Sequence, residues 1–456
     1  MKRIACVLAS VCAVLVCAPV HVVRAADPPP NVVIVMTDDQ RFDMVTGRFM
    51  PSVDRAFVRG ADPRFPNSTT TAFRNAFVPN SLCCPSRTAV LTGDYSHTTG
   101  VWTNNPPFGG LASFVSFGDS STIATDFRSH GYRTAMIGKY LNGYSGGVTM
   151  VVPPGWDRWF ATKNGAYYDY GVTAAEDGRV RRRYFGSRPA DYSTRVFERQ
   201  ASDFVDDSVA TGKPFFLYYA FTAPHHPWIP DPRDIGRFAD VTSDETGTPM
   251  VKDGMLEAAY GTDRAIGDLL DHLPAHTIVL FMSDNGYLWG EEKGRWGSLV
   301  SKQWPYNESI RIPMTLTSLD GTFSPAARGN DIVLNVDLRR TLTGAAGITP
   351  PFNEGLDLGS DGYTPRTVFP LEHLQSKGHD PPTYCGAREI DPARGRDFMY
   401  VRYHVIRDDG TDRYREELYA EPNELRNVAD SRPDDVARMR AAAQAMCSPP
   451  PPGYGW

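Results

Sequence analysis

The chain has 456 residues, of which 41% are apolar and 22% are charged. This length and apolar content allow a large hydrophobic core, which predicts one big domain and a smaller unit beside it. The formal net charge of −6 argues against nucleic-acid binding through bulk charge. An anionic ligand must therefore be held by local cations rather than by the overall field.

Residues 1–25 have the pattern of a secretory signal peptide. Lys2 and Arg3 give the chain a basic start, residues 4–20 form an apolar run, and small residues end the segment near Ala25. A retained membrane anchor is the alternative, but Pro19 and His21 shorten the apolar run below a comfortable span. We predict a secreted or cell-envelope (periplasmic) protein, with no stable membrane insertion after cleavage.

The cysteine count agrees with an oxidising compartment. Three of the seven cysteines lie in the predicted signal peptide. Of the remaining four, Cys385 and Cys447 are candidates for a disulfide bond. The competing pair is Cys83 with Cys84, which would form a strained vicinal bridge, so the pairing stays open at this point.

Apolar runs alternate with helical patterns along most of the chain. Strands are predicted at 32–36, 134–137, 215–221 and 277–282, and helices at 121–130, 194–209 and 255–273. This alternation predicts an α/β fold with a largely parallel sheet, whose ligands sit at the carboxyl ends of the strands.

Polar residues follow four of the predicted strands. These residues are Asp38 and Asp39, Lys139, His225, and Asp284 with Asn285. Three carboxylates and one amide form an all-oxygen set, which suits Ca²⁺ or Mg²⁺. Each acidic pair alone would more often be a helix cap or a loop. Together, at matching strand ends, they predict a metal site with cations nearby.

The C-terminal third is predicted as a separate unit. Residues 347–400 are rich in proline and glycine and are predicted as loops. Strands near 398–405 and 416–419 and a helix near 433–446 follow. The predicted domains are 31–350 and 351–447, with an extended or disordered proline-rich tail at 448–456.

One short segment carries the most specific chemistry. It is Cys83-Cys84-Pro85-Ser86-Arg87, inside the segment Ser81–Gly93. This C-x-P-S-R pattern resembles the signature of type I sulfatases, the formylglycine-dependent members of the alkaline phosphatase superfamily. Further segments resemble the family in the same order, with a weaker match near the C-terminus, and they are residues 131–142, 223–228, 301–313 and 417–425.

The resemblance implies a role for each matching residue. Cys83 would be converted to formylglycine by a formylglycine-generating enzyme, and the aldehyde hydrate would attack a sulfate ester. Arg87, Lys139 and Lys302 would hold the sulfate, and His225 would be the general acid that protonates the leaving alcohol. One divalent cation, calcium or alternatively magnesium, would be bound by Asp38, Asp39, Asp284, Asn285 and the modified Cys83.

Departures from the family pattern narrow the substrate class. Leu141 stands where many sulfatases carry a histidine, and the segment G-K-Y-L-N resembles an N-acetylglucosamine-6-sulfatase-like branch. The implied substrates are sugar sulfates such as N-acetylglucosamine 6-sulfate, with aryl sulfates as a side activity. Residues that select the alcohol half of the ester are expected in loops at 103–110 and 143–182.

Two alternative functions stay open from the sequence. One is a phosphonate or phosphate ester hydrolase of the same superfamily. The other is a non-catalytic binder of sulfated glycans. The intact Cys83, Arg87 and His225 argue against the binder, because binding requires no nucleophile.

Overall fold

A computed structural model describes residues 28–145, 147–162, 165–241, 252–290, 299–377, 380–406, 411–420 and 426–456. The predicted signal peptide and residues 421–425 of the C-terminal motif lie outside the described residues. Within these ranges, every helix is too short or too polar to cross a bilayer.

The larger domain is built on a nine-stranded mixed sheet, in the order β2-β12-β9-β1-β8-β4-β5-β6-β7. The central strands β9, β1, β8, β4 and β5 are parallel, and the strands beyond them are antiparallel. The strands are β1 (Asn31–Thr37), β2 (Thr69–Ala72), β4 (Arg133–Lys139), β5 (Arg158–Thr162), β6 (Tyr170–Glu176), β7 (Arg179–Phe185), β8 (Phe215–Ala220), β9 (Thr277–Ser283) and β12 (Met314–Ser318). The predicted α/β class is confirmed.

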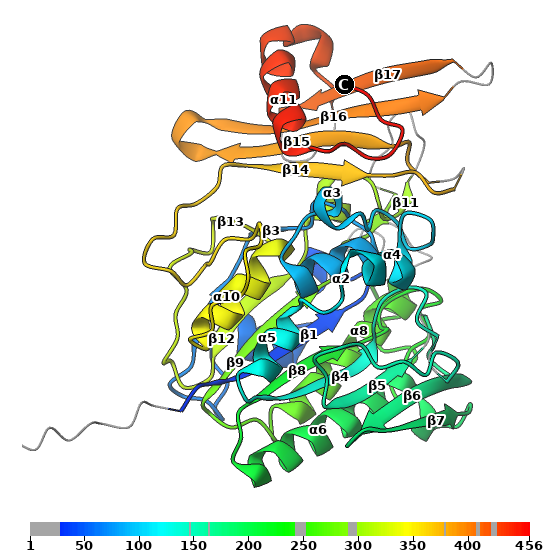
Figure 1. Ribbon diagram of the computed structural model, residues 1–456, viewed down its shortest axis with the longest axis vertical. Coiled ribbons are helices and arrows are strands. Elements are labelled where there is room, and N and C mark those ends of the chain that lie inside the picture. Colours follow the sequence, from blue (N-terminus) through cyan, green and yellow to red (C-terminus); the bar gives the residue numbers. More distant parts are fainter. Residues whose placement is uncertain are drawn as a thin grey trace, which may run out of the picture.

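Helices cover both faces of this sheet (Figure 1). One face packs against α2 (Cys83–Thr92), α5 (Ile123–Ser129) and α10 (Leu338–Ala345), and the other against α6 (Ser193–Thr211) and α8 (Lys252–Leu269). Alternate residues of each strand enter the two cores, as the two-residue period of a strand requires. Thus Val32 and Ile34 lie in one core and Val33 and Val35 in the other.

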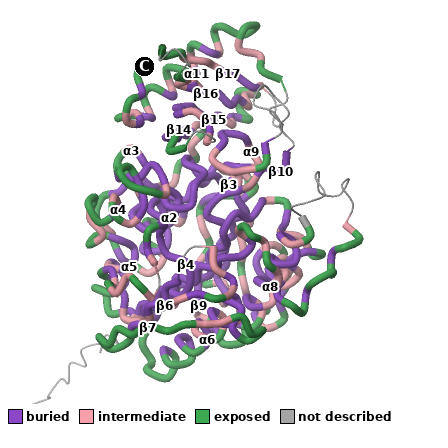
Figure 2. The backbone as a smooth tube through the Cα atoms, turned by 90° about the vertical axis from the view of Figure 1, so that its right-hand side faces the viewer, coloured by how far each residue is buried: buried purple, intermediate pink, exposed green. Residues whose placement is uncertain are grey.

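The smaller unit is a four-stranded antiparallel sheet with one helix (Figure 1). Its elements are β14 (Val368–His373), β15 (Tyr384–Asp391), β16 (Arg396–Ile406), β17 (Asp412–Tyr419) and α11 (Pro433–Met446). Tyr400 faces α11, whereas its neighbours Met399 and Val401 face the larger domain. Figure 2 shows buried segments running through both units.

Two predictions about loops are wrong. Residues 347–400 contain β14, β15 and the start of β16, and residues 143–182 contain β5, β6 and most of β7. In β14, Pro370 interrupts the pattern but is tolerated because the strand lies at the edge of its sheet. Buried charged residues such as Glu372 and Arg388 further obscure the apolar alternation of β14 and β15.

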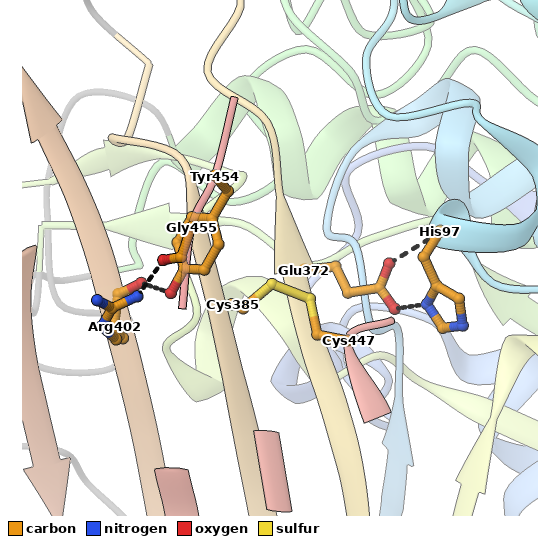
Figure 3. The surroundings of a disulfide bond; sticks show 7 residues. All are labelled: His97, Glu372, Cys385, Arg402, Cys447, Tyr454 and Gly455. Atoms are coloured by element: carbon orange, nitrogen blue, oxygen red, sulfur yellow. Dashed lines mark hydrogen bonds and ion pairs between the residues drawn. A yellow bond between two sulfur atoms is a disulfide. The ribbon is translucent and has the colours of Figure 1, made fainter. Parts of the chain in front are cut away.

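The C-terminal tail is fixed to the smaller sheet. Cys385 in β15 and Cys447 at the end of α11 form a disulfide bond, which is one of the two pairings that the sequence left open (Figure 3). Beyond it, Tyr454 is buried and its hydroxyl donates a 3.0 Å hydrogen bond to the carbonyl of Arg402. The tail therefore packs against β16, and the alternative of a disordered tail is wrong.

A buried ion-pair cluster joins the two units. His97, in α3 (Ser96–Thr99), places Nδ1 2.6 Å from Oε1 of Glu372 in β14 (Figure 3). Its Nε2 lies 3.4 Å from Oε1 of Glu354. Burial alone would lower the pKa of His97, but the two glutamates outweigh it and raise the pKa to about 10. The imidazolium form therefore stabilises the contact between the units.

Replacing His97 by glutamine should destabilise the protein most at neutral and mildly acidic pH. The folded pKa of about 10 exceeds the ordinary histidine value of 6.5, so this stabilisation is complete below pH 6.5 and is lost as the pH rises toward 10. We expect a Tm lower by roughly 1–3 °C at pH 6.5, with the difference shrinking by pH 10. A pH series of thermal melts, with exposed His130→Gln as control, checks this; a pH-independent difference would contradict it.

Candidate active site

The polar residues predicted at strand ends meet at one edge of the large sheet. The backbone NH of Asp38, just after β1, donates to the carbonyl of Ala223 after β8 at 3.2 Å. On the other side of β1, the NH of Asp284 donates to the carbonyl of Thr37 at 3.1 Å. Parallel strands thus bring three loops side by side, as the sequence predicts.

Helix α2 delivers Cys83 and Arg87 to the same place. Cys83 is the first helical residue and Arg87 lies one turn later, and both are fully buried. The side chain of Asn104 accepts a 2.9 Å hydrogen bond from the NH of Cys84, which satisfies a free donor of the first turn. No sequence pattern indicated this role of Asn104.

Arg87 joins two of the carboxylates. Its Nε donates to Oδ2 of Asp284 at 2.8 Å, and its Nη2 lies 3.5 Å from Oδ2 of Asp38. A third hydrogen bond runs from Nη1 to the carbonyl of Lys139 at 2.8 Å. These contacts pair and hydrogen-bond a guanidinium that is removed from water.

The two lysines complete the charge balance. Lys139 forms an ion pair with Asp38, and Lys302 forms one with Asp39. The ammonium of Lys302 also lies 2.7 Å from the sulfur of Cys83. Lys302 belongs to a loop tied to α2, because the NH of the residue after it donates to the carbonyl of Ser81 at 2.9 Å.

The surroundings set the protonation of Cys83. Burial raises the pKa of its thiol to about 11, although Lys139 and Lys302 act in the opposite direction. An unmodified Cys83 therefore stays protonated near neutral pH. Since the thiolate is the nucleophilic form of cysteine, this residue is a poor nucleophile as it stands.

The pKa values of Asp38 and Asp39 are shifted in the opposite direction from that of Cys83. Burial would raise the pKa of Asp38, but Lys139 and other cations outweigh it, so the net pKa lies below the usual range. The same holds for Asp39, where Lys302 is the leading cation. Both groups are ionised at neutral pH and can bind a cation.

His225 lies beside this cluster. Its Nε2 is 3.7 Å from Oδ2 of Asp39, and its Nδ1 lies 2.6 Å from the carbonyl of His226, which orients the ring. Burial lowers the pKa of His225, against the pull of Asp38 and Asp39. The hydroxyl of Tyr167 donates to the backbone carbonyl of His225 at 2.6 Å, a support that no sequence pattern indicated.

The donor set fits a hard divalent cation. Ligand atoms of Asp38, Asp39, Cys83 and His225 lie within 4.8 Å of one another. Asn285 donates from Nδ2 to Asp39 at 2.7 Å, which leaves its Oδ1 buried without a hydrogen-bond partner. A buried amide oxygen without a hydrogen-bond donor is suited to coordinate a hard cation. Asp284 is linked to the set through a 3.1 Å bond from the NH of Asp39.

Leu141 and Ser309 both lie in segments that resemble the family pattern. Leu141 is buried in the apolar core beside α2, so this position supplies no proton donor. Ser309, inside the recognised segment 301–313, shares a 2.8 Å hydrogen bond with Ser81 and thereby fixes the start of α2. The sequence singled out the segment but not this contact.

The largely parallel sheet, with acidic and cationic side chains gathered at its carboxyl edge, defines an alkaline phosphatase-like fold with a candidate anion- and metal-binding site. Residues 30–348 match the Sulfatase family. The chain belongs to that family.

Individual relatives agree with this assignment. The chain is 30% identical to an extracellular sulfatase Sulf-1 homologue of Caenorhabditis elegans, over 72% of this chain and 48% of the relative. It is also 30% identical to N-acetylglucosamine-6-sulfatase of Homo sapiens, over 73% of this chain and 63% of the relative. The chain thus spans about half to two thirds of the length of these relatives.

Solved structures show the same fold. A protein in complex with its substrate D-glucosamine-2-N,6-O-disulfate superimposes with a TM-score of 0.71 at 21% sequence identity. The match covers 93% of this chain and 100% of that protein. It extends over both the larger domain and the C-terminal sheet.

Proposed function

We propose that this protein hydrolyses sulfate monoesters of sugars, with formylglycine at position 83 as the nucleophile. The observation that carries the proposal is the convergence on buried Cys83 of Arg87, two lysines and an acidic cluster. A sulfate monoester needs cations around its oxygens and a proton for the departing alcohol. The cluster offers both.

The cations have separate tasks in this proposal. Arg87 is held rigidly by Asp284 and supplies a fixed array of donors. Lys139 and Lys302 are paired with Asp38 and Asp39, the carboxylates that a metal would also use. A metal on these carboxylates would leave both ammonium groups to a sulfate.

The modification of Cys83 is part of the proposal. The high pKa of its thiol argues against direct use of the cysteine. Formylglycine supplies a hydrated aldehyde, which can take up a sulfate group and later release it without attack of water on sulfur. A formylglycine-generating enzyme is therefore a required partner during maturation.

His225 is proposed as the general acid. The carbonyl of His226 occupies its Nδ1, so Nε2 is the nitrogen that exchanges a proton with the ester. Asp38 and Asp39 favour the protonated ring but offset the effect of burial only in part, so the pKa of His225 lies below its usual value. The leaving alcohol oxygen is protonated from this nitrogen.

The proposed metal is Ca²⁺, with Mg²⁺ as the alternative. It would be held by Asp38, Asp39, Asp284 and Asn285 together with the modified residue 83, and it would help to neutralise the sulfate. The oxygen-rich set and the unpartnered Oδ1 of Asn285 support a hard cation.

Adding Ca²⁺ to chelator-treated protein should raise both Tm and activity. A ligand that binds only the folded state stabilises it by about 2.7 kcal/mol at 100 times its Kd. Thermal melts with and without Ca²⁺ or Mg²⁺ measure the shift without relying on turnover. The Asp39→Asn variant should lose most of this thermal shift, whereas the variant Asp240→Asn, at an exposed position, should keep it. Equal melts with and without either ion would contradict the metal assignment.

The proposed substrate is N-acetylglucosamine 6-sulfate or a polymer containing it. Two observations support it: the matching human relative is an N-acetylglucosamine-6-sulfatase, and the matching structure holds a sulfated glucosamine. Secretion is supported by the named extracellular relative and by the disulfide of Cys385 and Cys447.

A side-by-side assay tests the function. Purified protein carrying the modification would be given N-acetylglucosamine 6-sulfate, an aryl sulfate and an aryl phosphonate monoester of matched leaving group. We expect the sulfates to be hydrolysed with the higher kcat/KM. Dominant phosphonate turnover would replace the sulfatase by the phosphonate hydrolase, and no turnover of any ester would favour a glycan binder.

A further inference from the structure

A row of arginines lies on the outermost strand of the large sheet, away from the active site. Strand β7 reads Arg-Val-Arg-Arg-Arg-Tyr-Phe, and Arg179, Arg181 and Arg183 alternate along it. All three are exposed. Alternate strand residues point to the same face, so these side chains form a row about 13 Å long.

The row faces the side of the sheet that α6 covers. Arg181 pairs with Ala174 and Arg183 with Val172, and both partners pack toward the core beneath α6. Helix α6 packs over β4 and β8, and β7 lies three strands farther out (Figure 1). A recess of about 350 Å³ therefore opens between the arginines and the helix, with Gln200 of α6 in its lining.

The described residues neutralise the positive charge of this recess only in part. None of their carboxylates forms an ion pair with Arg179, Arg181 or Arg183. The recess does include Glu176 and Asp177. Glu176 lies 3.6 Å from Arg158, which is also paired with Asp207 at 3.1 Å. Three unpaired cations in an acidic protein favour an anionic ligand.

We infer that this recess binds a sulfated segment of a glycan chain, away from the ester that is cleaved. A row about 13 Å long is too long for one sulfate ion but suits anions repeated along a polymer. Guanidinium groups bind such oxyanions with paired donors. The choice of a sulfated glycan rests on the proposed function of the active site.

The position of the recess suits a polymer that reaches both sites. Lys139 pairs with Thr162, Thr162 with Val172, and Val172 with Arg183, so Arg183 and Lys139 lie at the same level of the sheet. Three strand spacings separate them, about 14 Å. The row continues from Arg183 toward Arg179, away from the active-site edge. One chain of a few sugars can therefore contact both sites.

The double variant Arg181→Ala/Arg183→Ala tests this inference. The control is Arg182→Ala/Arg413→Ala. It also removes two positive charges, one from the opposite face of β7 and one from an exposed position of β17. The probe is heparin, and binding is measured by calorimetry at two salt concentrations, with Cys83→Ala in every protein to prevent turnover. Intact Arg182 also keeps the edge strand charged in the test variant, which discourages strand pairing.

We expect the test variant to bind heparin roughly tenfold more weakly, with a shallower salt dependence, and the control to match the parent. In proteins that retain Cys83, aryl sulfate turnover should be unchanged by either double variant. Equal heparin affinity of test and control, or no heparin binding by the parent, would overturn the inference. Equal loss of double-stranded DNA binding would also overturn it, since the recess would then bind any polyanion.

The same experiment separates this inference from the proposed function. If the parent protein with Cys83 hydrolyses no sulfate ester, the proposed function fails, yet the heparin comparison still reports on the recess. If esters are hydrolysed and heparin binding does not depend on Arg181 and Arg183, only the recess fails.

Discussion

Replacing Cys83 by alanine should lower sulfate ester turnover by roughly 10⁴-fold or more, because the nucleophile is removed while the cations remain. Cys84→Ala is the matched control. Cys84 is equally buried, but it belongs to the apolar core beside α2. The Cys84→Ala variant should therefore lose some stability and keep most of its kcat.

The measurement is kcat on an aryl sulfate, normalised to the fraction of formylglycine found by mass spectrometry of the Asn75–Arg87 tryptic peptide. The Cys83→Ala protein should still bind Ca²⁺ through its carboxylates and show a thermal shift in the parent's direction. Turnover of this variant within tenfold of the parent would show that another group is the nucleophile.

Replacing Arg87 by methionine should both destabilise the protein and abolish activity. The change leaves Asp38 and Asp284 buried without their shared guanidinium, and loss of one partner of a buried ion pair costs about 3–5 kcal/mol. It also removes a cation from the sulfate, for which we expect roughly a 10³-fold loss of kcat. Added Ca²⁺ should offset part of the destabilisation, since it neutralises the same acids.

Arg339→Met separates the two effects. Arg339 is also buried, and its Nε donates to Asp126 at 2.7 Å, but its contacts lie among α2, α5 and α10. It should lose similar stability while its folded fraction keeps normal kcat. Chemical denaturation and active-site-normalised kinetics measure both. Equal kcat losses in the two variants would mean that Arg87 acts through stability alone.

The sequence predicts most of the active site because the carboxyl ends of parallel strands share one edge. Once β1, β4, β8 and β9 are recognised, Asp38, Lys139, His225 and Asp284 must converge there. Lys302 is different, since its loop does not directly follow any of those strands in the sequence, and it was found only through the family resemblance. The support of His225 by Tyr167 depends on backbone contacts that no spacing reveals.

The C-terminal sheet shows where sequence patterns fail. The pattern of β15 is interrupted by Gly386 and by charged residues that are nevertheless buried, such as Arg388 and Glu389. Arg388 forms hydrogen bonds with the carbonyls of Glu389 and Phe398, so its burial depends on contacts made only after strands pair. The local alternation of apolar residues does not indicate such hydrogen-bond partners.

The complete burial of Cys83 limits when this residue can be modified. The residue has no exposed surface, and α2 is buried along its whole length. Under the proposed function, the modifying enzyme must reach the C-x-P-S-R segment while the chain is still open, so oxidation and folding would compete for the same molecules. The active fraction of a preparation should then depend on the ratio of two rates, and slower folding at low temperature should raise it even when the total yield is unchanged.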